Sequence, residues 1–128
     1  MEMKILLASP SPEALAPFSE ALSAEKDVKL LRASNAQEAL ETAADSKPDL
    51  VVLDERIKDM ESLEVIKRML QVDPFINVAC VSTLSSDEFH EYFEGLGVLA
   101  QLPADAGPKE AEGLLARLAA IKNQVAGV

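Results

Sequence analysis

The sequence predicts a single doubly wound α/β domain, in which a parallel sheet carries helices on both faces. Short apolar runs typical of buried strands alternate with segments of helical periodicity, and parallel strands joined by crossover helices give this alternation. The strongest strand signal is the run from Pro48 to Asp54, where four consecutive apolar residues lead to a carboxylate. The chain has 128 residues, which suits one domain, and we place that domain at 1–128.

Five segments have the length and the aliphatic composition of buried strands. They are Lys4–Ser9, Val28–Arg32, Leu50–Leu53, Asn77–Val81 and Leu99–Leu102. Helical periodicity fills the intervals between them and the segment after the last one. Five strands and five helices are therefore expected, with no internal repeat or linker.

The first helix is expected to begin at Ser11, which acts as the N-cap with Pro12 at the first helical position. Pro17 falls inside this segment and has no N–H to donate, so we expect either a kink or a later start of the helix. The apolar face of the helix is Leu15, Phe18 and Leu22.

The second and third helices have clear end signals. Ser34 and Gln37 have the spacing of a capping box, which predicts that Ser34 begins a helix running to about Asp45. The third helix is expected to end at Asp73-Pro74, because proline cannot continue it. The core face predicted for the third helix is Leu63, Ile66 and Leu70.

The C-terminal third predicts a short fourth helix and a long fifth one. The fourth helix is expected to end at Gly95 or Gly97 and carries the aromatic residues Phe89, Tyr92 and Phe93. The last helix is expected from Pro108 to about Gln124. Its apolar stripe is Leu114, Leu115, Leu118 and Ile121.

Composition and charge narrow the function classes. Apolar residues make up 48% of the chain and charged residues 27%, as in an ordinary folded domain. No apolar run is long enough to cross a bilayer and no export signal is visible, so a cytoplasmic protein without membrane contact is expected. The net charge of −10 opposes binding to nucleic acid. Cys80 lies in an apolar run, which predicts a buried thiol.

Three segments carry a resemblance to a known family. They are Arg32–Leu40 (RASNAQEAL), Pro48–Asp54 (PDLVVLD) and Leu63–Ile66 (LEVI). From Met3 to about Gln124 the chain resembles the receiver domain of bacterial response regulators. This resemblance implies a flavodoxin-like receiver fold with strand order 2-1-3-4-5 and a place in two-component, phosphorelay signalling. It also puts Asp54 at the position that accepts a phosphoryl group from a histidine kinase.

The chain departs from the pattern of that family at the reactive positions. By the resemblance, Ser9 and Pro10 stand where two acidic residues help to hold Mg²⁺, and Leu102 stands where a lysine precedes a proline. Ser82 matches the hydroxyl that contacts a phosphoryl oxygen. With one carboxylate left, Mg²⁺ binding is expected to be weak or lost, and Asp54 is expected to be a poor acceptor.

Plain structural roles are the alternatives for the same side chains. Asp54 can simply cap the turn after its strand, and Ser82 can cap a strand end. His90 lies between acidic residues and is expected at the surface. Three acids near the sheet ends could in principle replace the lost metal ligands, although we do not expect it: Glu55, Asp59 and Asp105.

The resemblance also implies that the fourth helix, fifth strand and fifth helix form the face that binds a protein partner or a second copy in a homodimer. The residues assigned to this face are Phe89, Tyr92, Phe93 and Leu99. Its three aromatic residues cannot share one narrow buried stripe, so one is expected to face outward, and we expect this to be Phe93. Gly95 and Gly97 can each be aligned with a glycine of the family, and in one of these two alignments Leu99 takes the place of the family's aromatic switch residue.

Three functions compete. The first is an atypical receiver that acts as a phosphorylation-independent interaction module, with no enzymatic activity and no cofactor. The second is a phosphoacceptor receiver that is modified on Asp54 and needs Mg²⁺. The third is a binder of a small anionic ligand, or a flavodoxin-like carrier, that uses Ser9 and Ser11 at a helix N-terminus. The third lacks the glycines and stacking aromatics that such a site needs.

Overall fold

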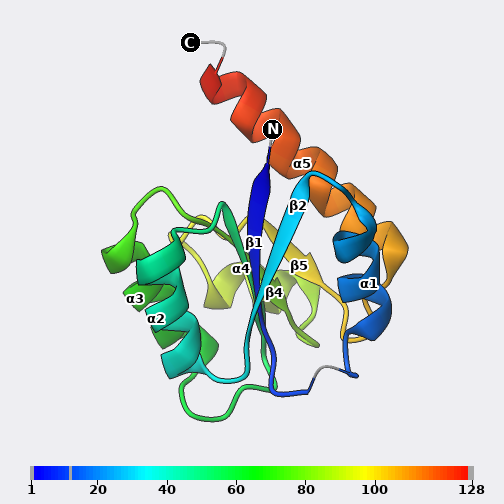
Figure 1. Ribbon diagram of the computed structural model, residues 1–128. Helices are drawn as coiled ribbons and strands as arrows, with labels where there is room; N and C mark the ends of the chain where they lie inside the picture. Colours follow the sequence, from blue (N-terminus) through cyan, green and yellow to red (C-terminus); the bar gives the residue numbers. More distant parts are fainter. Residues whose placement is uncertain (1, 12, 127–128) are drawn as a thin grey trace.

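The computed structural model describes residues 2–11 and 13–126, and this part of the chain forms one parallel sheet of five strands with five helices (Figure 1). The strands are β1 (Met3–Ala8), β2 (Val28–Ala33), β3 (Leu50–Asp54), β4 (Asn77–Val81) and β5 (Ala100–Leu102). The helices are α1 (Ala16–Ala24), α2 (Ala36–Ser46), α3 (Ser62–Val72), α4 (Ser86–Tyr92) and α5 (Pro108–Ala126). The strand order is β2-β1-β3-β4-β5, which confirms the predicted fold class.

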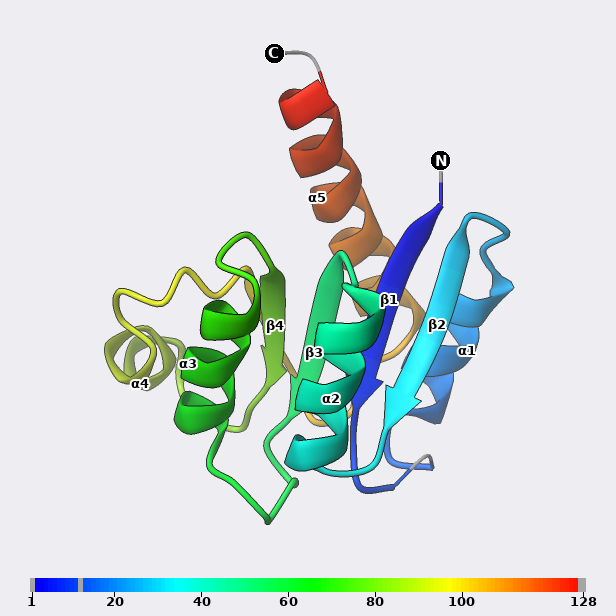
Figure 2. The ribbon, with the colours of Figure 1, turned by 60° about the vertical axis from the view of Figure 1, so that its left-hand side comes forward.

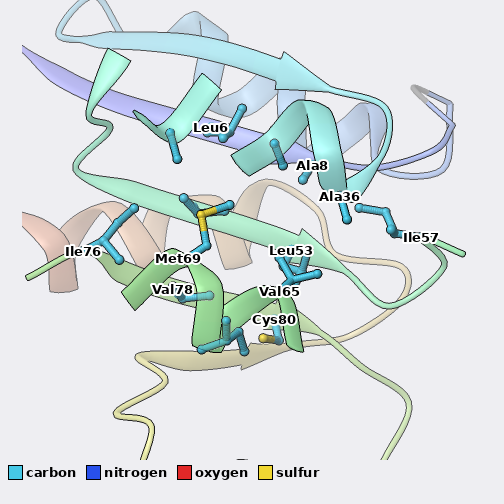
Figure 3. Packing of buried hydrophobic residues seen from close by; sticks show 14 of the residues in the cluster. Leu6, Ala8, Ala36, Leu53, Ile57, Val65, Met69, Ile76, Val78 and Cys80 are labelled. Carbon is cyan, nitrogen blue, oxygen red and sulfur yellow. The ribbon is translucent and has the colours of Figure 1, made fainter. Parts of the chain in front are cut away.

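Helices cover both faces of the sheet, as Figure 2 shows for α2 and α3 in front and for α1 and α5 behind. Side chains alternate along β3 and so contribute to both faces of the sheet. Val51 and Leu53 pack under α2, α3 and α4. Leu50 and Val52 pack under α1 and α5. Figure 3 shows the first of these clusters, in which Met69 and Val65 of α3 pack on Leu53. We call the two clusters the α2–α4 core and the α1–α5 core.

The start of α1 decides between the two outcomes predicted for Pro17. The helix begins at Ala16 with Leu15 as the N-cap residue, so Pro17 lies in the first turn, where its missing N–H costs no helical hydrogen bond. The later start is confirmed, and the prediction that Ser11 is the N-cap is wrong. The prediction for Pro12 lies outside the described residues.

The N-cap of α2 is Asn35, one residue later than predicted. The Asn35 side chain accepts a hydrogen bond from the Glu38 N–H at 2.8 Å, whereas the Ser34 N–H and hydroxyl both reach the Glu38 carboxylate at 3.3 Å. Asparagine is as good an N-cap residue as serine, and Glu38 lies three residues after it. The predicted Ser34–Gln37 capping box is therefore wrong by one position.

The buried face of α3 is also shifted from the predicted stripe. Val65, Ile66 and Met69 are buried, whereas the predicted Leu63 and Leu70 are half-buried against the edge of the α2–α4 core. On α5, Leu114 and Leu118 are buried, and Leu115 and Ile121 are half-buried. The periodicity predicted the helices correctly, but which side of each helix is buried depends on its contacts with other elements.

The aromatic residues of α4 correct a prediction about the partner face. Phe93 is 6% exposed and Tyr92 is 42% exposed, so Tyr92, not Phe93, is the outward residue. Phe89 and Phe93 are four residues apart and share one face, with their ring centroids 4.7 Å apart. Tyr92 packs edge-on against Phe93 from outside. After the helix, Gly95 and Gly97 both have positive φ, which suits glycine.

Two further predictions concern the burial of Cys80 and of His90. Cys80 is buried in the α2–α4 core, as predicted, and burial raises the pKa of its thiol to about 12. His90 is exposed, also as predicted. Among the helices of the described residues, none is long and apolar enough to cross a membrane.

Candidate functional site

The candidate site lies at the carboxyl ends of β1, β3 and β4, where Asp54 ends the central strand. The Asp54 side chain is 0% exposed, and both of its oxygens accept hydrogen bonds. Arg56 Nε lies 2.9 Å from Oδ1 and 3.1 Å from Oδ2, and the Arg56 backbone N–H donates to Oδ1 at 3.0 Å. The Ser9 hydroxyl donates to Oδ2 at 2.8 Å. The carboxylate is therefore neutralised and solvated by the protein itself.

Local chain geometry explains this arrangement. Asp54 accepts from the N–H two residues ahead, which is the hydrogen bond of an Asx turn, and the Ile57 N–H donates to the Asp54 carbonyl at 3.2 Å. The same tight turn brings the Arg56 side chain back over the carboxylate. The hydrogen bond between the Arg56 side chain and the Asp54 carboxylate raises the pKa of the Arg56 guanidinium above its ordinary value. The ion pair thus consists of a buried carboxylate and a guanidinium on a side chain that is 40% exposed.

The residues after β1 do not form a ligand set for Mg²⁺. This ion prefers carboxylate oxygens and water in octahedral geometry. At this place the chain offers the Ser9 hydroxyl and the exposed ring of Pro10, and the nearby Asp54 carboxylate already accepts from a guanidinium. Among the described residues, no group of three or more acidic, histidine or cysteine side chains could hold a metal. The donor set therefore does not fit the ion.

The acids considered as replacement ligands serve other purposes. The Asp59 carboxylate accepts from the N–H groups of Ala36 and Gln37, at 2.9 and 3.2 Å, and so caps α2. These hydrogen bonds, that from Ala36 foremost, lower the pKa of Asp59. Glu55 binds the loop after β4, as described below, and Asp105 is exposed.

Ser82 and Leu102 lie next to each other at the ends of β4 and β5. The Ser82 N–H donates to the Leu102 carbonyl at 3.0 Å, and the Ser82 hydroxyl accepts from the Leu84 N–H at 3.2 Å. Leu102 is 5% exposed, and its side chain packs in the α1–α5 core. The residue at the expected lysine position therefore contributes to packing.

Two side chains form hydrogen bonds with the backbone of the loop between β4 and α4. The Glu55 carboxylate accepts from the Thr83 N–H at 2.8 and 3.1 Å, which joins this loop to the one that carries Asp54 and Arg56. From the other side, Gln101 Nε2 of β5 donates to the Leu84 carbonyl at 2.7 Å. Beyond the loop, a capping box between Ser85 and Glu88 fixes the start of α4.

The residues assigned to the partner face are only partly together. Phe89, Phe93 and the half-buried Leu99 line a groove of about 840 Å³ between α4, β5 and α5. Tyr92 instead borders a smaller cavity of about 390 Å³ between the loop after β3 and α4, which Ser82 also lines. The exposed apolar residues also include Phe75 and Val72, which the sequence analysis did not single out.

Sequence reasoning missed Arg56 and the bond from Glu55 to Thr83. The Asp-x-Arg spacing was visible after β3, and a short turn at a strand end brings such a pair together. The importance of this pair comes from the full burial of Asp54, which the spacing alone does not predict. The partner of Glu55 had no comparable signal, because it depends on the placement of two separate loops.

Comparisons with known proteins agree with the fold and identify the family. A family described as response regulator receiver domain matches residues 5–104. Sporulation initiation phosphotransferase F of Bacillus subtilis is 32% identical over 68 residues, which span 53% of this chain and 55% of that relative.

Two solved structures share the fold. A CheY-like response regulator receiver domain protein from Methanospirillum hungatei has a TM-score of 0.83 at 19% identity, covering 97% of this chain and 99% of that one. The response regulator domain of Thermotoga maritima CheB has a TM-score of 0.80 at 20% identity, covering 96% and 98%.

Proposed function

Because the chain belongs to the response regulator receiver domain family, we propose that it is an atypical member that acts as a phosphorylation-independent interaction module in two-component signalling. The observation that carries this proposal is the state of the Asp54 carboxylate. Both of its oxygens accept hydrogen bonds inside the protein, and the cation that neutralises it is Arg56 of the same chain.

Phosphoryl transfer depends on positioning and on charge neutralisation, since the protein contributes little covalent chemistry. An attacking carboxylate oxygen has to be free on one side, and cations have to face the incoming phosphoryl group. Here Ser9 covers Oδ2 of the acceptor, and the nearby cation is already paired with the acceptor itself. Leu102, buried in the α1–α5 core, offers no charge. These features together support a carboxylate with a structural role.

The loop contacts support a domain that keeps one conformation. Glu55 links the loop after β3 to Thr83, and Gln101 holds the Leu84 carbonyl. A signal that moved the loop after β4 would have to break both contacts. We therefore propose that the surface beside this loop, formed by α4, β5 and α5, is permanently ready to bind a protein partner. No enzymatic step is part of this role.

Acetyl phosphate with Mg²⁺ provides the test of the proposal. We expect the intact mass of the wild-type domain to stay unchanged after incubation, in parallel with an Asp54→Asn control. A phosphoryl adduct on the wild type that is absent from the control would overturn the proposal in favour of a phosphoacceptor receiver. An adduct of the same mass and the same extent on both proteins marks modification at another residue and leaves Asp54 unmodified, as the proposal states.

A further inference from the structure

The groove between α4, β5 and α5 has an apolar floor and an acidic wall, and from this pairing we infer that it binds a basic segment of a partner protein with a large apolar anchor side chain. This inference rests on the proposed role as an interaction module and specifies the chemistry of the partner. The groove has a volume of about 840 Å³, which is ample for one or two large side chains.

The floor of the groove is apolar. Phe89 and Phe93 are almost fully buried beneath it, and Val98 and Leu99 are half-buried at its surface. A large apolar side chain seated here would remove the exposed parts of Val98 and Leu99 from water, worth about 25 cal/mol for each Å² of apolar surface. Anchors of this kind, set in a pocket and surrounded by polar contacts, carry most of the affinity of protein interfaces.

The wall formed by α4 is acidic. Glu91 of α4 and Glu94, two residues after the end of that helix, line the groove, and Asp87 is exposed on α4. Among the side chains that the structure describes, no salt bridge involves any of these three acids. Arg117 of α5 lines the opposite side and offsets part of this charge. The wall is therefore a set of carboxylates that lysine or arginine side chains of a partner would complement.

The same charge argues against the other occupants of such a groove. A second copy docked with α4 against α4 across a two-fold axis would bring the same acidic residues together, and like charges at an interface are unfavourable. Nucleic acid is repelled by these acids and by the net charge of −10. An added strand would find an edge strand, β5, of only three residues. A basic segment that inserts an apolar side chain complements both the acidic wall and the apolar floor.

A selection of random displayed peptides on the unphosphorylated wild-type domain tests the inference. We expect the enriched peptides to combine an aromatic residue or leucine with flanking lysine or arginine. In NMR titrations with a synthetic enriched peptide, the amides of Phe89, Leu99 and Ala100 should shift. The double variant Glu91→Lys/Glu94→Lys should weaken binding at least about tenfold. The control Glu41→Lys/Asp45→Lys changes the net charge equally, on the exposed side of α2, and should bind like the wild type.

Several results would overturn the inference. These are enrichment of peptides without a basic excess, shifts that map away from the groove, equal weakening by both double variants, and failure of the selection to yield any binder. Dimerisation that buries the groove would also contradict it. Sedimentation of the wild type detects a dimer, and the amides of Phe89, Leu99 and Ala100 report whether its contact surface is the groove. Failure here is separable from failure of the proposed function, because phosphorylation of Asp54 is read by mass in a separate experiment without peptide.

Discussion

Replacing Arg56 with alanine lowers the free energy of unfolding by about 2 kcal/mol, because it leaves a fully buried carboxylate without its cation. Asp54 would keep the Ser9 hydroxyl and one backbone N–H, which solvate the charge but do not neutralise it. We place the effect below the largest losses known for buried ion pairs, since the Arg56 side chain is 40% exposed and water can enter the space it leaves.

The chain offers a matched control for this prediction. Arg68 Nε lies 3.1 Å from Glu64 Oε1, almost the distance of the Arg56 pair, but both partners are on the surface of α3. The variant Arg68→Ala should therefore cost no more than about 0.5 kcal/mol. Urea denaturation at neutral pH measures both variants. Equal losses for Arg56→Ala and Arg68→Ala would show that Asp54 does not depend on its arginine.

Rebuilding the acidic site should give the domain a measurable affinity for Mg²⁺. In the variant Ser9→Asp/Pro10→Asp/Arg56→Ala, carboxylates after β1 join Asp54 after β3, and the guanidinium that occupies Asp54 is gone. Carboxylate oxygens with water are the ligands this ion prefers. We expect Mg²⁺ to bind at least about tenfold more tightly than to the wild type. Leu102 is left in place, because a lysine there would bury its stem and charge in the α1–α5 core.

Calorimetric titration with Mg²⁺ measures this gain, and amide spectra establish that the variant is folded. Adding Asp54→Asn to the same variant removes the central ligand and should reduce the gain. If the folded triple variant binds Mg²⁺ no better than the wild type, the three positions do not converge on one site. The assignment of Ser9 and Pro10 to the family's acidic positions would then be wrong.

The sequence predicted the sheet well because strand signals are local. The runs that became β3 and β4 each contain four consecutive apolar residues, a composition typical of strands buried on both faces. Pro17 predicted either a kink in α1 or its late start, which is the outcome found, because the missing N–H acts within one turn. The position of Asp54 at the end of a buried strand followed from these signals, whereas the central place of that strand was implied by the family resemblance.

Predictions failed where two neighbouring residues were both suited to the same role. Asn35 and Ser34 both suit an N-cap, and the contact of Glu38 with each decides which one takes it. Phe93 and Tyr92 are neighbours in sequence, and only the packing of Phe89 against Phe93 shows which ring turns inward. Arg56 escaped notice because its role depends on the depth at which Asp54 is buried. The depth at which a side chain is buried and the side of a helix that faces inward depend on how the helices pack on the sheet, and a sequence pattern does not determine them.

Amide NMR spectra of the wild-type domain, recorded while Mg²⁺ and then beryllium fluoride are added, test the central claim most directly. Beryllium fluoride mimics a phosphoryl group on a carboxylate. We expect the spectrum to stay unchanged, because Asp54 is already held by Arg56 and Ser9. Shifts that begin at Asp54 and Ser82 and extend to Tyr92 and Leu99 would contradict the account and show a working phosphorylation switch.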